Sequence, residues 1–333
     1  MKSPVTGKEM TLKTEAIEHE FRKEKFVIIY HYYRCEDSGE TFEDEDLMRL
    51  NLSQVYNQFR SKHNLPFPEE IISLREQYGL SASRMSEVLG FGINVYRSYE
   101  NGEIPSSSNA RLIQLAMDPR EFKRLVDLSD VLTEKELVRV RTKIDELLLR
   151  DAVNDFNLQS FLMGSRVADD QTGYRIPNLV KFTEMVVYFA KETQPWKTKL
   201  NKLLFYADFS HFRKTGLSIS GSRYRAINRG PVPNNFNSIF EYLASREQVD
   251  ISYKTISNDV VGEQFRPHPN KRFDETVFTG AELSTLQEIV AKFGDTATNA
   301  IIEISHQEEA WERNYRDGKK LISYIDAFKL KTI

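Results

Sequence analysis

Hydrophobic and polar positions follow a period of two in the segment FVIIYHYYR, residues 26–34. Alternate positions starting from Phe26 and from Val27 make up its two faces. Because β-branched and aromatic residues occupy both faces, the pattern predicts a strand that is partly covered on each side. Residues 10–13 are its expected partner, so residues 1–42 are predicted to form a small β-sheet or hairpin.

A helical period replaces this alternation further along the chain. The acidic stretch 43–46 is expected to begin a helix that reaches about residue 64, because carboxylates are favourable at the positive end of a helix dipole. Residues 67–117 then show short helical segments separated by tight turns. Three short helices joined by three-residue turns are the layout of a helix-turn-helix. The predicted helices of this segment begin at Pro68 and cover 82–89 and about 93–101.

Residues 119–150 are expected to continue as helix, and the polar residues 151–177 to form a linker. From residue 178 the apolar periodicity resumes and predicts a second globular domain, mainly helical with short β-like segments. The expected helices cover 179–190, 200–212, 236–243, 281–293, 297–313 and the C-terminal end, and the β-like segments cover 224–228, 249–253 and 276–279. The predicted class is therefore multidomain α+β.

Composition excludes several classes of protein. The 333 residues carry 46 basic and 49 acidic side chains, a net charge of −3. Charge alone therefore does not indicate a surface that binds nucleic acid. A single cysteine excludes an intrachain disulfide. No apolar run approaches the ~18 residues of a membrane span. These features predict a cytoplasmic protein without a membrane partner.

Two short stretches have the spacing of zinc knuckles. They are SPVTG at 3–7 and CEDSG at 35–39, each with a two-residue gap between possible ligand positions followed by glycine. Only Cys35 is still a cysteine, and the hydroxyls at the other positions are poor zinc ligands. One thiolate cannot hold a structural zinc. The sequence therefore predicts the shape of a metal module without a metal.

The third short helix carries the side chains expected to read DNA. Asn94 and Arg97 should be exposed at its N-terminal end, with Ser98 next, and asparagine and arginine pair with adenine and guanine edges or with phosphate. Ser81 and Ser83 are placed for phosphate contacts at the start of the second helix. Tyr96 completes the predicted DNA-binding set. The alternative for the whole segment is a three-helix core that serves packing alone.

The ribbon and the helical segment together resemble MqsA-type antitoxins of bacterial toxin–antitoxin systems. The resemblance covers roughly residues 1–118. In that family the ribbon binds zinc and contacts the toxin, and the recognition helix reads operator DNA through an Asn and an Arg. Asn94 matches that Asn. Ser98 stands at the position of the family's Arg. Arg97 lies one residue earlier, which is about 100° of helix rotation, so it is expected to reach phosphate. The matching residues are Arg75, Glu76, Gln77, Gly79, Leu80, Ser81, Gly90, Gly92, Asn94, Tyr99, Glu100 and Gly102.

The second half of the chain resembles a Panacea (SocA-like) domain, a toxin-neutralising module found beside many unrelated toxins. The run KLLFYADFSHFRKTGLSISGSRYRAINRGPVP at 202–233 carries most of the resemblance, with SHQEEAW at 305–311 and LISYIDA at 321–327. Pro231 is expected to open a helix. Most of the aromatic and glycine residues are interpreted as maintaining the fold. The candidate toxin contacts are Arg223, Arg225, Arg229, Asp208 and His211.

Enzyme chemistry finds little support in the sequence. Asp208, Ser210 and His211 lie within four positions but fan around a helix, so they form no local triad. His306 beside two glutamates lacks the H-E-x-x-H order of a zinc protease. No glycine-rich phosphate loop occurs. We therefore expect a protein without catalytic residues and without a cofactor.

These observations predict four parts and a function. The parts are a metal-free ribbon-like module over 1–66, a helix-turn-helix over 67–118, a helical connector over 119–177 and a Panacea-like domain over 178–333. The predicted protein is an antitoxin that binds its cognate toxin through the last part and represses its own operon as a homodimer through the second. The alternatives are a transcription regulator whose C-terminal domain senses a ligand or protein, and an enzyme.

Overall fold

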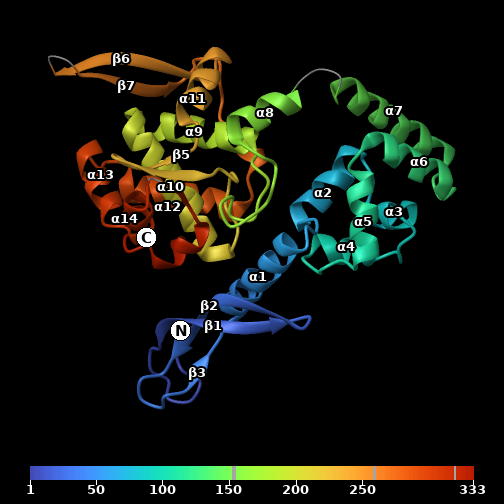
Figure 1. Cartoon of the computed structure of the whole chain (residues 1–333), viewed down its shortest axis with the longest axis horizontal. Helices are drawn as coiled ribbons and strands as arrows, with labels where there is room; N and C mark the ends of the chain where they lie inside the picture. Colours follow the sequence, from blue (N-terminus) through green and yellow to red (C-terminus); the bar gives the residue numbers. More distant parts are fainter. Residues whose placement is uncertain (152–154, 258–259, 319) are drawn as a thin grey trace. The chain divides into compact units, whose positions relative to one another are not determined.

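The computed structural model of the chain describes residues 1–151, 155–257, 260–318 and 320–333. Helices predominate and small antiparallel sheets accompany them, so the α+β class is confirmed (Figure 1). Contacts between Cα atoms divide the chain into two compact units, and each is described by itself. The first unit joins Met1–Val55 with Gln159–Ile333, and the second unit is Tyr56–Leu158. The four predicted domain boundaries stay predictions.

The first unit opens with a three-stranded sheet in the order β1-β2-β3. β1 (Thr11–Phe21) pairs with β2 (Glu24–Arg34) along its whole length, and β3 (Thr41–Phe42) pairs with the end of β2. The expected partner strand over 10–13 is thus only the start of a longer one, whose mostly exposed and polar residues weakened its pattern. The two residues between β1 and β2 have φ of 49° and 66°, the left-handed backbone of a two-residue hairpin loop.

α1 (Glu45–Lys62) follows this sheet close to the predicted position. Two side-chain amides of α1 bind the free edge of β2. Asn51 and Gln54 exchange hydrogen bonds of 2.8 to 2.9 Å with the backbone N–H and C=O groups of His31 and Ile29. The amides take the place of a neighbouring strand and so satisfy an otherwise open sheet edge.

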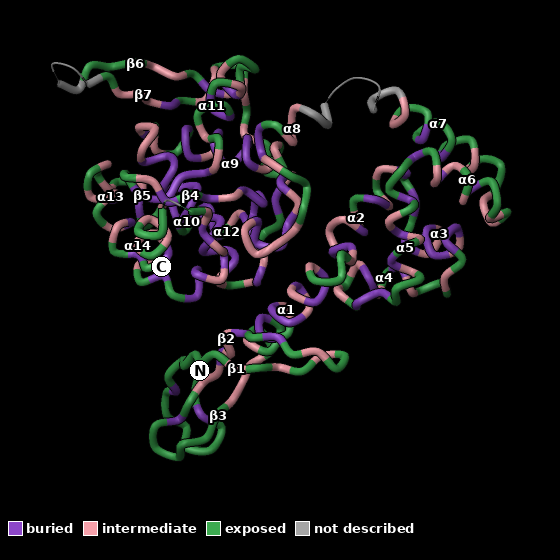
Figure 2. Tube along the Cα trace, viewed as in Figure 1, coloured by how far each residue is buried: buried purple, intermediate pink, exposed green. Residues whose placement is uncertain are grey.

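In its described residues the second unit consists of helices and turns, and buried side chains of these helices form a hydrophobic core. Figure 2 shows the buried stretches along them. The prediction of a continuous helix over 119–150 was wrong. The first helix ends at Asp130, where φ is 51°. The next helix begins where Thr133 and Glu136 form a reciprocal capping box. The helices of this region are α2 (Pro68–Gln77), α3 (Ala82–Val88), α4 (Val95–Glu100), α5 (Ser107–Ala116), α6 (Pro119–Ser129) and α7 (Glu134–Asp151).

The larger part of the first unit is built around α10 (Lys197–Thr215), whose side chains are all buried from residue 199 to 212. A three-stranded sheet in the order β5-β4-β8 and a separate two-stranded sheet of β6 and β7 accompany the helices (Figure 1). The other elements are α8 (Asp155–Met163), α9 (Leu179–Thr193), β4 (Tyr224–Ile227), β5 (Gly230–Pro233), α11 (Phe236–Ser245), β6 (Val249–Ser257), β7 (Val260–Pro267), η1 (Glu275–Val277), α12 (Gly280–Phe293), α13 (Thr298–His306), α14 (Glu309–Arg316), β8 (Leu321–Ile322) and η2 (Tyr324–Lys329).

The predicted linker over 151–177 is not a free linker where the structure describes it; residues 152–154 lie outside the described part. Its second half packs into the first unit. The Ser218 hydroxyl donates to the Thr172 carbonyl at 2.7 Å, and the Tyr324 N–H donates to the Asp170 carbonyl at 2.8 Å. These contacts use backbone carbonyl groups, while the polar side chains of Asp169 and Thr172 accept backbone N–H groups within the segment itself.

Several other expectations need correction. Pro231 lies in β5 and opens no helix, because its strand pairs with β4. The helix expected over 297–313 is two helices, α13 and α14, and the segment at 276–279 contains the 3₁₀ helix η1 rather than a strand. The expected C-terminal helix is also a 3₁₀ helix, and strand β7 was not predicted. Within the described residues, no helix combines the length and the apolar character that a membrane crossing requires.

The ribbon at the N-terminus packs against the C-terminal end of the same unit. The His31 ring of β2 meets the Phe328 ring of η2 edge-on, with 5.0 Å between centroids. The Ser53 hydroxyl of α1 donates to the Thr215 carbonyl of α10 at 3.2 Å. Burial lowers the pKa of His31, so an uncharged ring is favoured at this contact. Residues almost 300 positions apart in sequence thus share one packed surface.

Candidate functional site

The predicted DNA-reading segment consists of α3, a tight turn and α4. Gly90 has φ of 72°, a conformation that glycine adopts without a steric penalty and that lets α3 end abruptly. α4 begins at Val95 rather than at residue 93, and covers six residues.

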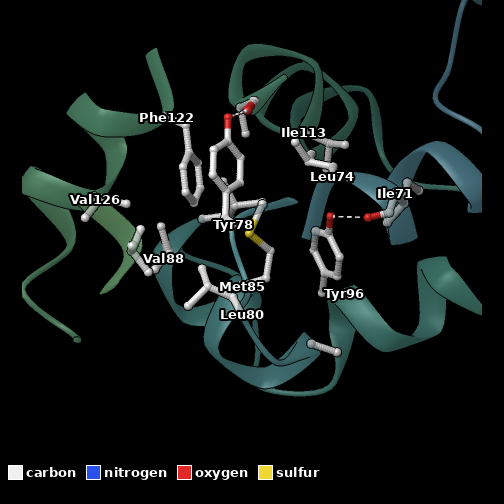
Figure 3. Close-up of a cluster of buried hydrophobic side chains, with 14 of the residues drawn as sticks. Ile71, Leu74, Tyr78, Leu80, Met85, Val88, Tyr96, Ile113, Phe122 and Val126 are labelled. Atoms are coloured by element: carbon white, nitrogen blue, oxygen red, sulfur yellow. Dashed lines mark hydrogen bonds between the residues drawn. The ribbon is translucent and has the colours of Figure 1, made fainter. Parts of the chain in front are cut away.

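Tyr96 fixes α4 against the rest of the second unit (Figure 3). Its side chain is fully buried, its hydroxyl donates to the Ile71 carbonyl at 2.7 Å, and its N–H donates to the Ser86 hydroxyl at 2.9 Å. An ion pair of 2.5 Å between Arg75 of α2 and Glu100 of α4 adds a second attachment. Tyr96 is therefore wrong as a DNA contact, since it belongs to the core that positions the helix.

The other predicted residues of α4 lie at the surface. Asn94 precedes the first turn of α4 and is exposed, Arg97 is exposed, and Ser98 is half-buried with its hydroxyl 3.5 Å from the Asn94 carbonyl. An amide and a guanidinium on one exposed helix end are the groups that pair with base edges and phosphates. Their role as DNA contacts stays a prediction.

Ser81 and Ser83 lie at the start of α3 as predicted. The Ser81 hydroxyl caps the helix by accepting the Arg84 N–H at 3.2 Å, and it lies 3.1 Å from the Ser83 hydroxyl. The cap occupies one acceptor position of Ser81, while backbone N–H groups of the first turn remain directed outward. A phosphate contact at this end would therefore use those N–H groups together with the Ser83 hydroxyl.

The two knuckle-like turns have the same internal hydrogen bonds. The N–H of Gly7 donates to the Ser3 carbonyl at 2.9 Å, and the N–H of Gly39 donates to the Cys35 carbonyl at 2.8 Å. Both glycines have positive φ, 72° and 75°. The turns meet where the Thr6 hydroxyl lies 3.3 Å from the Cys35 sulfur. Two of the four positions with ligand spacing, Thr6 and Cys35, are therefore in contact.

These turns carry a thiol and hydroxyls where a zinc site carries thiolates. Hydrogen bonds from Ser38, followed by the hydroxyl of Thr6, lower the pKa of Cys35 to about 6. In the part of the chain that the structure describes, no three His, Cys, Asp or Glu side chains come together in a metal-binding group. The site therefore combines one thiol of lowered pKa with a neighbouring hydroxyl.

Asp208 lies inside the core of the first unit and not at a partner surface. Its carboxylate accepts hydrogen bonds from the N–H groups of Ile219 and Ser220, both at 2.8 Å, from the Ser220 hydroxyl at 2.6 Å and from the Tyr224 hydroxyl at 2.8 Å. Burial raises the pKa of Asp208, and these donors oppose that rise. Asp208 is wrong as a toxin contact: it organises the loop between α10 and β4.

His211 is likewise buried, one turn further along α10. Its Nδ1 lies 3.3 Å from the Thr285 hydroxyl of α12. Burial lowers the pKa of His211 to about 3, and the nearby Arg175 contributes in the same direction. A neutral, enclosed imidazole cannot reach a partner protein, so this toxin-contact prediction is also wrong.

The three predicted arginines have different environments. Arg223 is mostly buried and binds the 165–169 loop, with 3.1 Å to the Ser165 carbonyl and 3.2 Å to the Asp169 carboxylate. Its role is therefore structural. Arg225 and Arg229 are exposed on the hairpin of β4 and β5, and Arg225 donates to the Asn234 side chain at 3.4 Å. These two remain candidate partner contacts.

Sequence reasoning missed the groups that hold this hairpin in place. Lys202 of α10 is fully buried and donates to the Pro231 carbonyl at 2.9 Å, while the Trp311 indole donates to the Ile227 carbonyl at 2.8 Å. Burial lowers the pKa of Lys202 to about 7. Gly230 approaches so closely that a Cβ atom there would lie 2.5 Å from Lys202 Cε. No sequence signal marks Lys202 as buried, because α10 mixes charged and polar residues with apolar ones and only its central position in the unit encloses the lysine.

Comparison with known families gives one finding for this part of the chain. Residues 200–312, from α10 to α14, match the family model described as "Antitoxin SocA-like, Panacea domain". A search of the curated proteins finds no match. The match supports the Panacea part of the predicted resemblance and leaves the resemblance of residues 1–118 a prediction. Residues 200–312 are similar to an antitoxin domain, which suggests a role in a toxin–antitoxin system and a toxin as partner.

Proposed function

We propose that this protein is the antitoxin of a type II toxin–antitoxin pair and neutralises its toxin by direct binding. The observation that carries the proposal is the match of residues 200–312 to the SocA-like antitoxin domain. The hairpin of β4 and β5 lies inside that match and offers Arg225 and Arg229 to a partner. Hydrogen bonds from buried Lys202 and half-buried Trp311 hold the hairpin in place, so little conformational entropy is lost when a partner binds it.

The second unit supplies a proposed regulatory activity. Asn94 and Arg97 are exposed beside a helix that Tyr96 and Glu100 fix to the core, an arrangement suited to reading DNA in the major groove. A homodimer would then bind a palindromic operator with half-sites ~34–36 Å apart. Repression of its own operon follows from this activity. We propose no catalytic role.

Co-expression tests the antitoxin role. The full chain is produced in cells together with the product of the small reading frame beside its gene, and growth is compared with cells that express that product alone. Rescue of growth together with a co-purifying complex is expected. If the neighbouring product is toxic and the full chain neither rescues growth nor binds it, the proposal is wrong and a regulator that senses another molecule replaces it.

A further inference from the structure

The two-stranded sheet of β6 and β7 projects from the body of the first unit (Figure 1). Its base belongs to the core: Val249 is 1% exposed and Phe265 is fully buried. Its outer half is not covered, since Tyr253 is 68% and Val261 is 61% exposed. A two-stranded ribbon is only marginally stable in water without a third strand or a covering surface. The apolar face of this arm thus extends beyond what the chain itself covers.

The outer edge of β7 is partly occupied. The Phe265 N–H donates to the Pro195 carbonyl at 2.9 Å, and Trp196 forms a bridge with Gln264. The outer edge of β6 differs, because among the described residues β6 pairs with β7 alone. β6 therefore presents the unpaired edge of the arm.

The backbone direction along this edge follows from the register. Phe265 donates away from β6, so its pair with Ile251 is one of the non-hydrogen-bonded pairs of the ladder. The pair of Val249 and Pro267, two positions further along, is also a non-hydrogen-bonded pair, which fits a proline because it has no N–H to donate. The N–H and C=O groups of Ile251 and Tyr253 consequently point outward from β6, where they can pair with another strand.

The sequence of β6 is self-complementary about Ser252. An antiparallel second copy centred on that residue brings Asp250 opposite Lys254 of the second copy, and Lys254 opposite Asp250 of the second copy. On the other face Ile251 meets Tyr253 of the second copy, twice by symmetry. Opposite charges and aromatic–aliphatic pairs directly across a ladder are both stabilising.

We propose that the free edge of β6 is a homodimer interface, in which two copies join their arms into one continuous four-stranded antiparallel sheet. The contact is isologous, as two-fold symmetry requires. Asp250 also lies opposite Arg266 in its own arm, so each row across the sheet alternates in charge: Arg266, Asp250, then Lys254 of the second copy. Ile251 and Tyr253 supply about four backbone hydrogen bonds across the axis.

Alternative registers are unfavourable. The outward-pointing groups alternate along β6, so the two-fold axis must pass through a residue and not between two residues. A centre at Asp250 or at Lys254 places like charges opposite each other, and a centre at Ile251 or Tyr253 leaves both charges without an opposite partner. The charge pattern therefore selects the centre at Ser252, where a one-residue slip is penalised.

A cysteine at the two-fold axis tests this register. Ser252 faces its own copy in a non-hydrogen-bonded pair with Cα atoms about 4.5 Å apart, within the range of about 4.4–6.8 Å that a disulfide spans. The full chain with Ser252→Cys should form a disulfide-linked dimer under mild oxidation, seen on a non-reducing gel. The matched control is Thr255→Cys, an exposed position on β6 that lies ~20 Å from its symmetry mate. The wild-type chain, whose single cysteine is the buried Cys35, shows how much cross-linking occurs without the new cysteine.

Charge reversal separates this interface from any other dimer. In the Ser252→Cys chain, either Asp250→Lys or Lys254→Asp alone should slow cross-linking about tenfold, because both pairs across the axis then carry like charges. A mixture of those two variants restores two attractive pairs and should cross-link at the original rate. A dimer formed through the second unit would not respond in this way.

Three results would overturn the proposal. They are the absence of cross-linking in Ser252→Cys, equal cross-linking of Thr255→Cys, and insensitivity to both charge reversals. Single cysteines can also be placed along the toxin. If Ser252→Cys forms a disulfide with one of them and none with a second copy of itself, the edge of β6 binds the toxin instead. None of these results touches growth rescue by the wild-type chain, so failure of the dimer and failure of the antitoxin role are distinguishable.

Discussion

At the residue scale, Cys35 has the spacing of a zinc ligand, whereas the other three positions with that spacing carry hydroxyls. The Thr6 hydroxyl lies 3.3 Å from its sulfur, and hydrogen bonding with Ser38 and then with Thr6 lowers the pKa of Cys35 to about 6. A lowered pKa favours the thiolate, which hydroxyl dipoles would stabilise where a zinc site uses the metal.

We predict that the thiolate absorbance of the single cysteine, measured at about 240 nm, titrates near pH 6 in the native chain. Ser38→Ala should move this midpoint upward, because it removes the largest stabilising hydrogen bond. Ser53→Ala, which removes a hydroxyl away from the sulfur, serves as the control. A native midpoint near the ordinary thiol pKa would contradict the assignment.

His211 makes the first unit sensitive to acid. Its pKa is about 3 in the folded chain and about 6.5 when unfolded, so the folded state binds fewer protons. The stability from its neutral form is complete above pH 6.5 and is lost as the pH falls towards 3. His211→Gln should reduce the loss of unfolding free energy between pH 6.5 and pH 3, measured by urea unfolding, by a few kcal/mol. The control His268→Gln replaces a partly exposed histidine and should leave this pH dependence unchanged. The same pH dependence of unfolding free energy in wild type and both variants would refute the effect.

At the element scale, α4 depends on its neighbours for both its place and its exposed face. A six-residue helix is too short to be stable alone, and Tyr96, Ser86 and the Arg75–Glu100 ion pair attach it. Packing therefore decides which side chains remain outward. Asn94 and Arg97 are outward for this reason.

The double substitution Asn94→Ala and Arg97→Ala should weaken operator binding by about 10- to 100-fold, because it removes a base contact of Asn94 that is worth about 1–3 kcal/mol and the phosphate contact expected of Arg97. Neutralisation of the toxin should not change. Arg124→Ala, an exposed arginine on α6, is the matched control. Gel-shift affinity with the DNA upstream of the gene measures the effect, and unchanged affinity in the double variant would remove these residues as readers.

The ribbon is a second element whose stabilisation can be tested. A structural zinc contributes roughly 10–16 kcal/mol to small modules, and here the amides of Asn51 and Gln54 and the contact of His31 with Phe328 stand in that place. We predict that metal analysis of the purified chain finds no stoichiometric zinc and that chelators leave the unfolding midpoint unchanged. One zinc per chain would contradict this account.

At the scale of the whole molecule, the two compact units do not follow the order of the sequence. Met1–Val55 shares a unit with Gln159–Ile333, so a truncation after residue 150 removes the surface against which the ribbon packs. Loss of neutralisation in such a truncation would have two causes. Point substitutions on the full chain separate them.

The second unit allows a cleaner division. Its buried core cluster lies entirely between Ile71 and Ile144. A fragment of residues 65–151 should therefore fold with a cooperative thermal transition and bind the same DNA without neutralising the toxin. Circular dichroism and gel shift test this, with the full chain as reference. A fragment without a cooperative transition would show that the core requires the rest of the chain.

How much the sequence predicts depends on the range of the interactions. The helix starts at Glu45, Pro68 and Ala82 lie within two residues of the expected positions, because caps and first-turn residues act over three or four positions. The 26–34 strand was predicted from another local signal, the alternation of its β-branched and aromatic residues. The partner strand β1 was underestimated, since an exposed edge strand needs no apolar alternation.

The sequence by itself determined the α+β class, the short helices of the second unit and the two matched turns of the ribbon, because each follows from local periodicity, caps and glycine spacing. Only the tertiary structure decided which polar residues face a partner. Asp208, His211, Tyr96 and Arg223 satisfy partners in the core, whereas Arg229 does not face it. The physical reason is that burial depends on contacts between distant segments, such as His31 with Phe328, which no local pattern encodes.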